Sequence, residues 1–308
     1  MQILWYSSLC MIHPDLISLG KHTYYMPDAA NIGVYVSGTD AYLIDSGRDR
    51  DAAKRVLRLL RASGLKLGGI INTHSHADHI GGNAYLQRQT GCPIWAPERE
   101  AYFITCPELE PAFLYGGFPH GGITGKLLMA KPSRVTAVFQ PPGSIEETPL
   151  QTLHLPGHSI SMAGILTPDG VCFTADAFIP QDLLERHRIP FLYDVKTALE
   201  TLEHLRRVEA SCFLPSHGQP AEEITEAAEA NRRRILEVTE VLLKLMRQPV
   251  SPDDLFKLTV EHFGIMLNHV TYILMRSCIN SFISYLLNEN RCTLSYTSNS
   301  ALITGDVL

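Results

Sequence analysis

The sequence predicts an α/β sandwich over residues 1–220, followed by a small, mostly helical domain over residues 221–308. In the longer part, short β-type runs alternate with amphipathic helical segments, a rhythm typical of layered α/β proteins. Near residue 221 the pattern changes to three consecutive helical periodicities. A cluster of histidine and aspartate side chains follows a buried strand in the first part, which indicates a metal site at the edge of a sheet.

The first strands end in glycine and lead into an amphipathic helix. "NIGVYVSG" and "AYLIDSG" (residues 31–38 and 41–47) are rich in β-branched and aromatic residues. Residues 49–64 carry apolar side chains at helical spacing, and Gly64 is placed to end that helix. The alternation continues with a buried strand at 67–76, a helix at 81–91, strands at 93–97, 134–140, 150–157, 164–170 and 170–177, a helix at 194–208 and a strand at 212–218.

Two segments do not follow this rhythm. Residues 1–13 are apolar but lack leading basic residues and a small-residue cleavage site, so we expect a first strand rather than a signal peptide. Residues 102–134 are rich in proline, glycine and aromatic residues. They predict an irregular segment that is either a lid or cleft wall, or a plain surface insertion.

The C-terminal part predicts three helices and a hairpin. Helices are expected at residues 221–246, 251–264 and 267–291, the second opening with a capping box of Ser251 and Asp254. Residues 292–305 alternate like a small hairpin. Three helices followed by a hairpin indicate a winged-helix-like domain, joined to the sandwich near residues 218–220.

Composition narrows the possible partners. The chain is 45% hydrophobic and 19% charged, as is usual for globular proteins. A net charge of −6 gives no general attraction to nucleic acid or to an anionic membrane, and no apolar run reaches the length of a membrane span. The seven cysteines form no C-x-x-C pair, so we expect most of them to be buried thiols in a reducing cytoplasm. Composition thus indicates neither a nucleic-acid nor a membrane partner, and the expected partner is a small-molecule substrate.

The segment "INTHSHADHIGGN" (residues 71–83) is the strongest functional signal. It places His74, His76, Asp78 and His79 within six positions. Imidazoles and carboxylates together suit zinc, iron or manganese, and so many ligands converge only in a loop that curls around the metal. Gly81 and Gly82 are expected to leave room for close backbone approach.

Further ligands are expected from the ends of other strands. His158 in "LPGHS", Asp176 in "FTADA" and His217 in "LPSHG" each lie at or just beyond an apolar, strand-like run. Strand ends of one sheet are where residues distant in sequence meet. We therefore expect these three side chains to join the histidine cluster.

Taken together, these motifs resemble the metallo-β-lactamase superfamily, and its glyoxalase II-like branch most closely. The resemblance spans about residues 20–220 and implies a four-layer αββα sandwich with metals at one edge. It implies that His74, His76 and His158 hold one metal ion, that Asp78, His79 and His217 hold a second, and that Asp176 bridges both. Asp45, in "LIDSG", matches the aspartate that the family places behind the site.

The resemblance also implies a reaction. Two divalent ions, zinc or iron with manganese as an alternative, would lie about 3.5–4 Å apart and lower the pKa of a shared water toward about 7, which supplies hydroxide. The expected activity is hydrolysis of an ester-type bond, with a thioester preferred, and Asp78 could help to protonate the leaving group. The C-terminal region lacks the family's basic and tyrosine residues for glutathione, so glutathione is not the expected carrier.

Three alternatives remain open. One is a lactone or a phosphodiester as substrate. Another is a mononuclear iron dioxygenase acting on persulfides, in which one iron replaces the two metals. The third is a DNA-binding regulator with a degenerate hydrolase domain. Against the last, residues 221–308 hold eight Lys or Arg and eleven Asp or Glu, so their net charge is −3. We expect this region to cover the site or to build a homodimer interface instead.

Candidate substrate residues lie outside the metal motifs. An aromatic wall for an acyl chain and a lysine for a carboxylate or phosphate would suit such a substrate. The candidates are Tyr115, Phe118, His120 and Lys126 in the irregular segment, and Tyr193 after the Asp176 strand.

Overall fold

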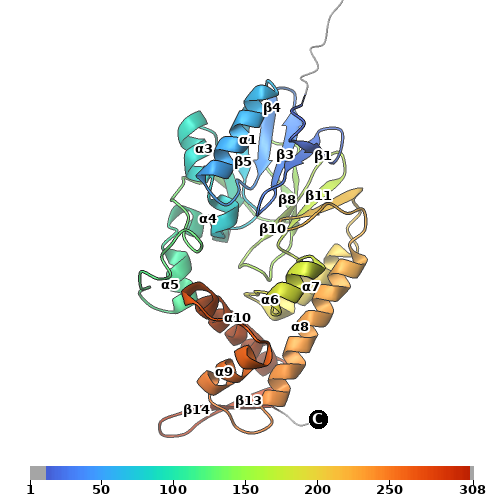
Figure 1. The fold of residues 1–308 in the computed structure, drawn as a ribbon. Coiled ribbons are helices and arrows are strands. Elements are labelled where there is room, and N and C mark those ends of the chain that lie inside the picture. Colours follow the sequence, from blue (N-terminus) through green and yellow to red (C-terminus); the bar gives the residue numbers. More distant parts are fainter. Residues whose placement is uncertain (1–11, 306–308) are drawn as a thin grey trace, which may run out of the picture.

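The structure is a computed structural model that describes residues 12–305. Figure 1 shows a sandwich of two sheets, with the last helices extending below it. The strand expected at residues 1–13 lies almost wholly outside the described residues, and Ile12 and His13 are not in a strand. The first described strand, β1, is Ile17–Ser18.

The first sheet has seven strands in the order β1-β2-β3-β4-β5-β6-β7. After β1 they are β2 (Thr23–Met26), β3 (Ile32–Ser37), β4 (Asp40–Ile44), β5 (Lys66–Ile71), β6 (Ile94–Pro97) and β7 (Ala137–Phe139). The first four pair antiparallel, whereas β4 to β7 pair parallel. The parallel half aligns the carboxyl ends of its strands, which is where the histidine segment begins.

The second sheet has five strands in the order β12-β11-β10-β9-β8. They are β8 (Gly143–Ser144), β9 (Gln151–His154), β10 (Ala163–Leu166), β11 (Val171–Ala175) and β12 (Cys212–Pro215). Only β11 and β12 pair parallel.

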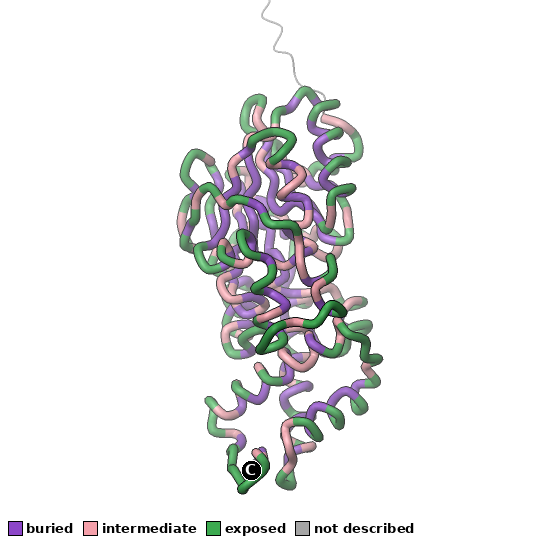
Figure 2. The backbone as a smooth tube through the Cα atoms, turned by 90° about the vertical axis from the view of Figure 1, so that its left-hand side faces the viewer, coloured by how far each residue is buried: buried purple, intermediate pink, exposed green. Residues whose placement is uncertain are grey.

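The predicted αββα sandwich is confirmed. Trp95 and Phe139 of the first sheet pack against Ile165 and Phe173 of the second in one buried apolar cluster. A Cβ on Gly33 would collide with the Phe173 ring, so glycine is what allows the sheets to approach there. Helices α1 (Arg50–Ala62) and α3 (Asn83–Thr90) cover the outer face of the first sheet, and α7 (Val195–Leu205) covers the second. Figure 2 shows that buried residues run through this body.

Helix α1 illustrates how local signals set the boundaries. The Asp49 carboxylate accepts hydrogen bonds from the backbone N–H groups of Asp51 and Ala52 and so caps the first turn. The helix ends at Ala62 with Ser63 as the cap residue, which agrees with the end that Gly64 predicts. Gly64 follows in the left-handed conformation with φ of 69° and reverses the chain.

The segment expected to be irregular contains two short helices, so that prediction is wrong in its first part. Helix α4 (Glu98–Thr105) starts directly after β6, and α5 (Leu109–Tyr115) follows. Ile104 and Leu114 anchor them in the interior. Helix α6 (Gln181–His187) is likewise absent from the elements that the sequence predicts. Each is too short to show a helical periodicity.

The C-terminal helices and the hairpin are confirmed. They are α8 (Thr225–Leu245), α9 (Pro252–His262), α10 (His269–Asn288), β13 (Cys292–Tyr296) and β14 (Ala301–Gly305). One buried apolar cluster joins Leu202 of α7 to Leu242 of α8 and Phe282 of α10, so the core continues across residue 220. The domain boundary and the winged-helix description remain predictions.

Helix α10 is the one helix of the described chain that is long and apolar enough to cross a membrane by length and composition. It has 20 residues with a mean hydropathy of 1.3. Its neighbours include α5, α7 and β13. It also packs on α9, where the ring centroids of Tyr272 and Phe256 lie 5.3 Å apart. Core helices share this length and composition, so the finding is weak support for a membrane span.

Candidate metal centre

The histidine segment forms a loop and one helical turn at the carboxyl end of β5. His74 and His76 lie in the loop, and α2 (Ala77–Ile80) carries Asp78 and His79. The close approach expected at the two glycines is confirmed. A Cβ on Gly81 would collide with the carbonyl oxygen of Arg48, and one on Gly82 with that of Ser46. The ligand loop therefore packs directly on the backbone that follows β4.

The other predicted ligands arrive from the ends of three strands. His158 follows β9, Asp176 follows β11 directly, and His217 follows β12. Ala175, just before Asp176, has a φ of 51°, and Asp45, just after β4, has a φ of 60°. Non-glycine residues in this conformation are strained, and such strain tends to gather at functional sites. Both strained positions here border the metal cluster.

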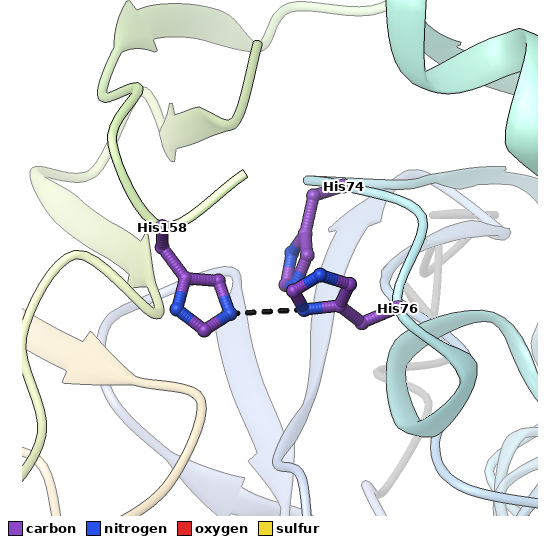
Figure 3. Close-up of side chains that lie close together, drawn as sticks. All are labelled: His74, His76 and His158. Atoms are coloured by element: carbon purple, nitrogen blue, oxygen red, sulfur yellow. Dashed lines mark hydrogen bonds between the residues drawn. The ribbon is translucent and has the colours of Figure 1, made fainter. Parts of the chain in front are cut away.

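The first group of ligands consists of His74, His76 and His158. Their nearest ring nitrogens all lie within 4.8 Å of one another (Figure 3). His76 Nδ1 is 3.1 Å from His74 Nε2 and 2.9 Å from His158 Nε2. Three imidazole nitrogens facing one point are the donor set of a catalytic zinc site that keeps a position open.

The second group consists of Asp78, His79 and His217. Asp176 lies between the two groups. Its Oδ2 is 3.4 Å from His158 Nε2 and 3.4 Å from His217 Nε2, while its Oδ1 is 3.6 Å from His79 Nε2. A single carboxylate thus reaches both groups, as a bridging ligand does.

In His158 and His217, the ring nitrogen that points away from the cluster donates a hydrogen bond, and this bond fixes the tautomer of the ring. His158 Nδ1 donates to the Phe191 carbonyl at 3.1 Å, and His217 Nδ1 donates to the Ala29 carbonyl at 2.6 Å. A carbonyl oxygen only accepts, so Nδ1 keeps its proton and the Nε2 lone pair faces the cluster whenever the ring is neutral. Asp45 lies where the family resemblance implies, with Oδ2 at 2.9 Å from His79 Nδ1. It also accepts from the backbone N–H and hydroxyl of Thr73, at 2.8 Å each.

Two buried atoms in the cluster lack any hydrogen-bond partner among the described residues. They are His79 Nε2 and Asp176 Oδ1. Orphaned buried polar atoms are costly and call for an explanation such as an ion. Imidazole and carboxylate donors suit a divalent cation, so the residues present fit two metal ions.

The two groups differ in their protonation. Burial lowers the pKa of His76 to about 3 and also lowers the pKa values of His74 and His158. The Asp176 carboxylate raises the pKa of His217 to about 9. Burial opposes charge on His79, but Asp176 and Asp78 outweigh it and raise the pKa of His79 well above its usual value. At pH 7 the three histidines of the first group are therefore neutral, whereas His79 and His217 of the second group are protonated.

This difference predicts how metal binding depends on pH. A metal ion must displace the His217 proton below about pH 9, so affinity for the ion in the second group should rise with pH up to that value. Calorimetry in buffers of different ionisation enthalpy should show proton release on binding at neutral pH. Binding without proton release would contradict the assignment.

The same shift predicts the stability of the metal-free protein. The folded pKa of His217 is raised from 6.5 to about 9, so its pairing with Asp176 stabilises the fold fully below pH 6.5. That contribution is lost as the pH rises through about 9. Thermal melts of metal-free protein should therefore show a lower Tm above this pH, and an unchanged Tm would contradict the pairing.

Comparison with known proteins identifies the family. Residues 25–217 match the family described as Metallo-beta-lactamase superfamily. The chain belongs to this superfamily. It is a metallo-hydrolase of the superfamily, and its histidine and aspartate side chains form two candidate metal sites.

Individual relatives agree with this assignment. A hydroxyacylglutathione hydrolase from Bradyrhizobium sp. (strain ORS 278) is 26% identical over 237 residues, or 73% of this chain and 82% of that protein. One from Methylococcus capsulatus (strain Bath) is 48% identical, but over only 46 residues, or 15% of this chain and 18% of that protein. A metallo-beta-lactamase family protein from Thermus thermophilus has the same fold, with a TM-score of 0.74 and 19% identity over 94% of this chain and 100% of that one.

Beside the metal centre lies a small cavity with residues that the sequence analysis did not single out. His76 and His158 form one side of it, and Phe113 and Phe191 lie on its walls. Glu110 also lines it, with Oε1 at 3.7 Å from His76 Nε2. Burial, with the charge of Glu100, raises the pKa of Glu110 to about 7. Phe113 and Glu110 lie in residues 102–134, and the only sequence feature that points to a cleft wall there is the content of proline, glycine and aromatic residues.

The predicted substrate residues are placed unequally. Tyr193 lines the cavity, with its ring centroid 5.8 Å from that of Phe113. Phe118 is 95% exposed, and His120 lies against His269 of α10. Tyr115 and Lys126 are also exposed, and Lys126 lies near enough to Asp49 to help lower its pKa. In the described chain, only Tyr193 of these five borders the cavity, and the binding role of all five remains a prediction.

Proposed function

We propose that this chain hydrolyses a thioester, using two divalent metal ions, zinc or iron, bound by the two groups. The observation that carries the proposal is Asp176, whose two oxygens face His158 and His217 on one side and His79 on the other. The relative from Bradyrhizobium, aligned over most of both chains, is named a hydroxyacylglutathione hydrolase, which supports a thioester as substrate.

The residues of the chain have separate tasks in this reaction. Metal ions bound there would supply Lewis acidity and a nucleophile from water at neutral pH. Asp45 holds the His79 ring, while the Phe191 and Ala29 carbonyls hold the His158 and His217 rings. The Asp78 side chain is 37% exposed, compared with 7% for that of Asp176, so its carboxylate is open to solvent. That position suits Asp78 for passing a proton to the leaving thiolate.

The cavity adjoins the metal centre but has a volume of only about 20 Å³, which is room for one small group, whereas the neighbouring groove of about 430 Å³ can hold a larger part of the substrate. Phe113 and Tyr193 border both spaces. The groove beyond them is lined by polar side chains of α10, including Asn280 and Ser284. Apolar walls with a few polar groups are the usual composition of a small-molecule site. A short acyl end at the cavity and a hydroxyl- or amide-bearing thiol carrier in the groove would match this division.

A substrate panel tests the proposal. Protein purified without added metal would be analysed for metal content and assayed with thioesters, lactones, phosphodiesters and a persulfide with oxygen. We expect two ions per chain and the highest kcat/KM for a thioester. A lactone or phosphodiester preference would overturn the substrate class, and one iron per chain with oxygen consumption would establish the dioxygenase instead.

Truncation of the aromatic wall should affect substrate binding more than metal binding. Tyr193→Ala and Phe113→Ala each remove ring contacts, so KM should rise about tenfold, or about 1.4 kcal/mol, while metal content stays at the parent level. Tyr296→Ala is the matched control because its ring is 76% exposed on the C-terminal hairpin. Unchanged KM in both cavity variants would exclude this cavity as the acyl site.

A further inference from the structure

Glu100 is a buried carboxylate that the proposed reaction does not use. It lies in α4, and its side chain is fully buried, with 0% exposure. Among the described residues, no Lys, Arg or His nitrogen lies within 4.0 Å of it. Buried charges are costly unless hydrogen bonds or nearby cations compensate them, so this position requires a reason.

Four hydrogen bonds converge on this carboxylate from two loops. Oε2 accepts from the backbone N–H of Ser75 at 3.1 Å and from its hydroxyl at 2.6 Å. Oε1 accepts from the Ser159 hydroxyl at 2.7 Å and from the backbone N–H of Ser161 at 2.8 Å. Each oxygen therefore serves one loop, and the carboxylate ties the two together.

These two loops carry the whole first group of ligands. Ser75 lies between His74 and His76, and Ser159 follows His158. The second group is held by different contacts, since His79 bonds to Asp45 and His217 bonds to the Ala29 carbonyl. The hydrogen bonds of Glu100 are thus made to residues next to His74, His76 and His158 and not next to His217.

We propose that Glu100 is a positioning residue that sets the spacing between the His74–His76 loop and the His158 loop, and so the metal affinity of the first group. The inference rests on the proposed function, because it requires that this group bind metal. Mutation of a side chain that supports metal ligands from outside the coordination shell commonly weakens metal binding by about 10–100-fold.

A carboxylate suits this place better than an amide. All four partners act as donors, and only a carboxylate offers two oxygens that both accept. In Glu100→Gln, one oxygen would still serve one loop, but the NH₂ group would face the donors of the other. The side chain keeps its size, so the change tests the hydrogen bonds rather than the packing.

The test measures each group separately. Cobalt(II) affinity, followed by its absorption spectrum, would be determined for His217→Ala, which keeps the first group intact, and for His76→Ala, which keeps the second. Adding Glu100→Gln should weaken binding about 10–100-fold in the first background and less than about twofold in the second. Glu108→Gln, an exposed carboxylate just before α5, is the control and should change neither.

A second measurement uses the metal-free protein. The N–H group of Ser75 or of Ser161, whichever faces the NH₂ group in Glu100→Gln, should exchange with solvent about tenfold faster because it loses its acceptor. Should that variant fail to fold, Ser159→Ala is the alternative. It removes one hydroxyl donor and leaves the Glu100 carboxylate in place, and it should still weaken metal binding by the first group several-fold. Equal weakening of both groups, or unchanged affinity and exchange, would overturn the inference. A parent protein that binds no metal would instead overturn the proposed function.

Discussion

Asp176→Asn should lower kcat/KM about 1,000-fold, equivalent to about 4 kcal/mol of transition-state stabilisation. The amide keeps the size of the side chain but removes the charge that faces His158, His79 and His217. Bound metal should fall from two ions per chain to one or none, because the Asp176 carboxylate faces both groups. Activity assays and metal analysis of the purified variant would check both effects.

The metal-free form of the same variant offers an independent check. Asp176 is the main reason that the pKa of His217 is raised to about 9, so this pKa should fall in Asp176→Asn and be measurable by NMR. Asp182→Asn changes an exposed aspartate of α6 and should leave activity, metal content and the pKa of His217 unchanged. Parent-like activity in Asp176→Asn would refute the bridging role.

His76→Ala should have an effect of similar size on activity, with a more selective loss of metal. His76 Nδ1 lies within 3.1 Å of both other nitrogens of the first group, so its removal leaves that group with two imidazoles. We expect one ion per chain to remain in the second group and kcat/KM to fall about 1,000-fold. Metal analysis after gel filtration, together with turnover of the best substrate, measures this.

The control for this variant is another histidine. His204→Ala removes an exposed imidazole from the last turn of α7 and should retain two ions and full turnover. Loss of both ions in His76→Ala would mean that the two groups bind metal as one cooperative unit. Two ions with full turnover would show that His76 is no ligand.

The gathering of the histidine and aspartate side chains could be predicted from the sequence because its signals are local. Four ligands stand within six residues, and His158, Asp176 and His217 each follow an apolar strand, so strand ends alone bring them together. The same holds for α1, whose Asp49 cap and Gly64 mark its ends. Such features need no knowledge of the tertiary structure.

The surroundings of the site could not be predicted in this way. Glu100 and Glu110 are carboxylates in short helices, and a glutamate in such a position is usually exposed. Their burial follows from how α4 and α5 pack beside the ligand loops, which depends on contacts distant in sequence. Phe118 shows the opposite case. It is a candidate for the substrate site because it is an aromatic residue in the suspected cleft segment, but it is 95% exposed.

The most direct test of the account is an anomalous difference map, recorded at the metal absorption edge from crystals grown with zinc. The account predicts two peaks about 3.5–4 Å apart. One should be bound by His74, His76 and His158, the other by Asp78, His79 and His217, with Asp176 between them. A map with no peak there, or with the His158 or His217 ring turned away from the cluster, would contradict it.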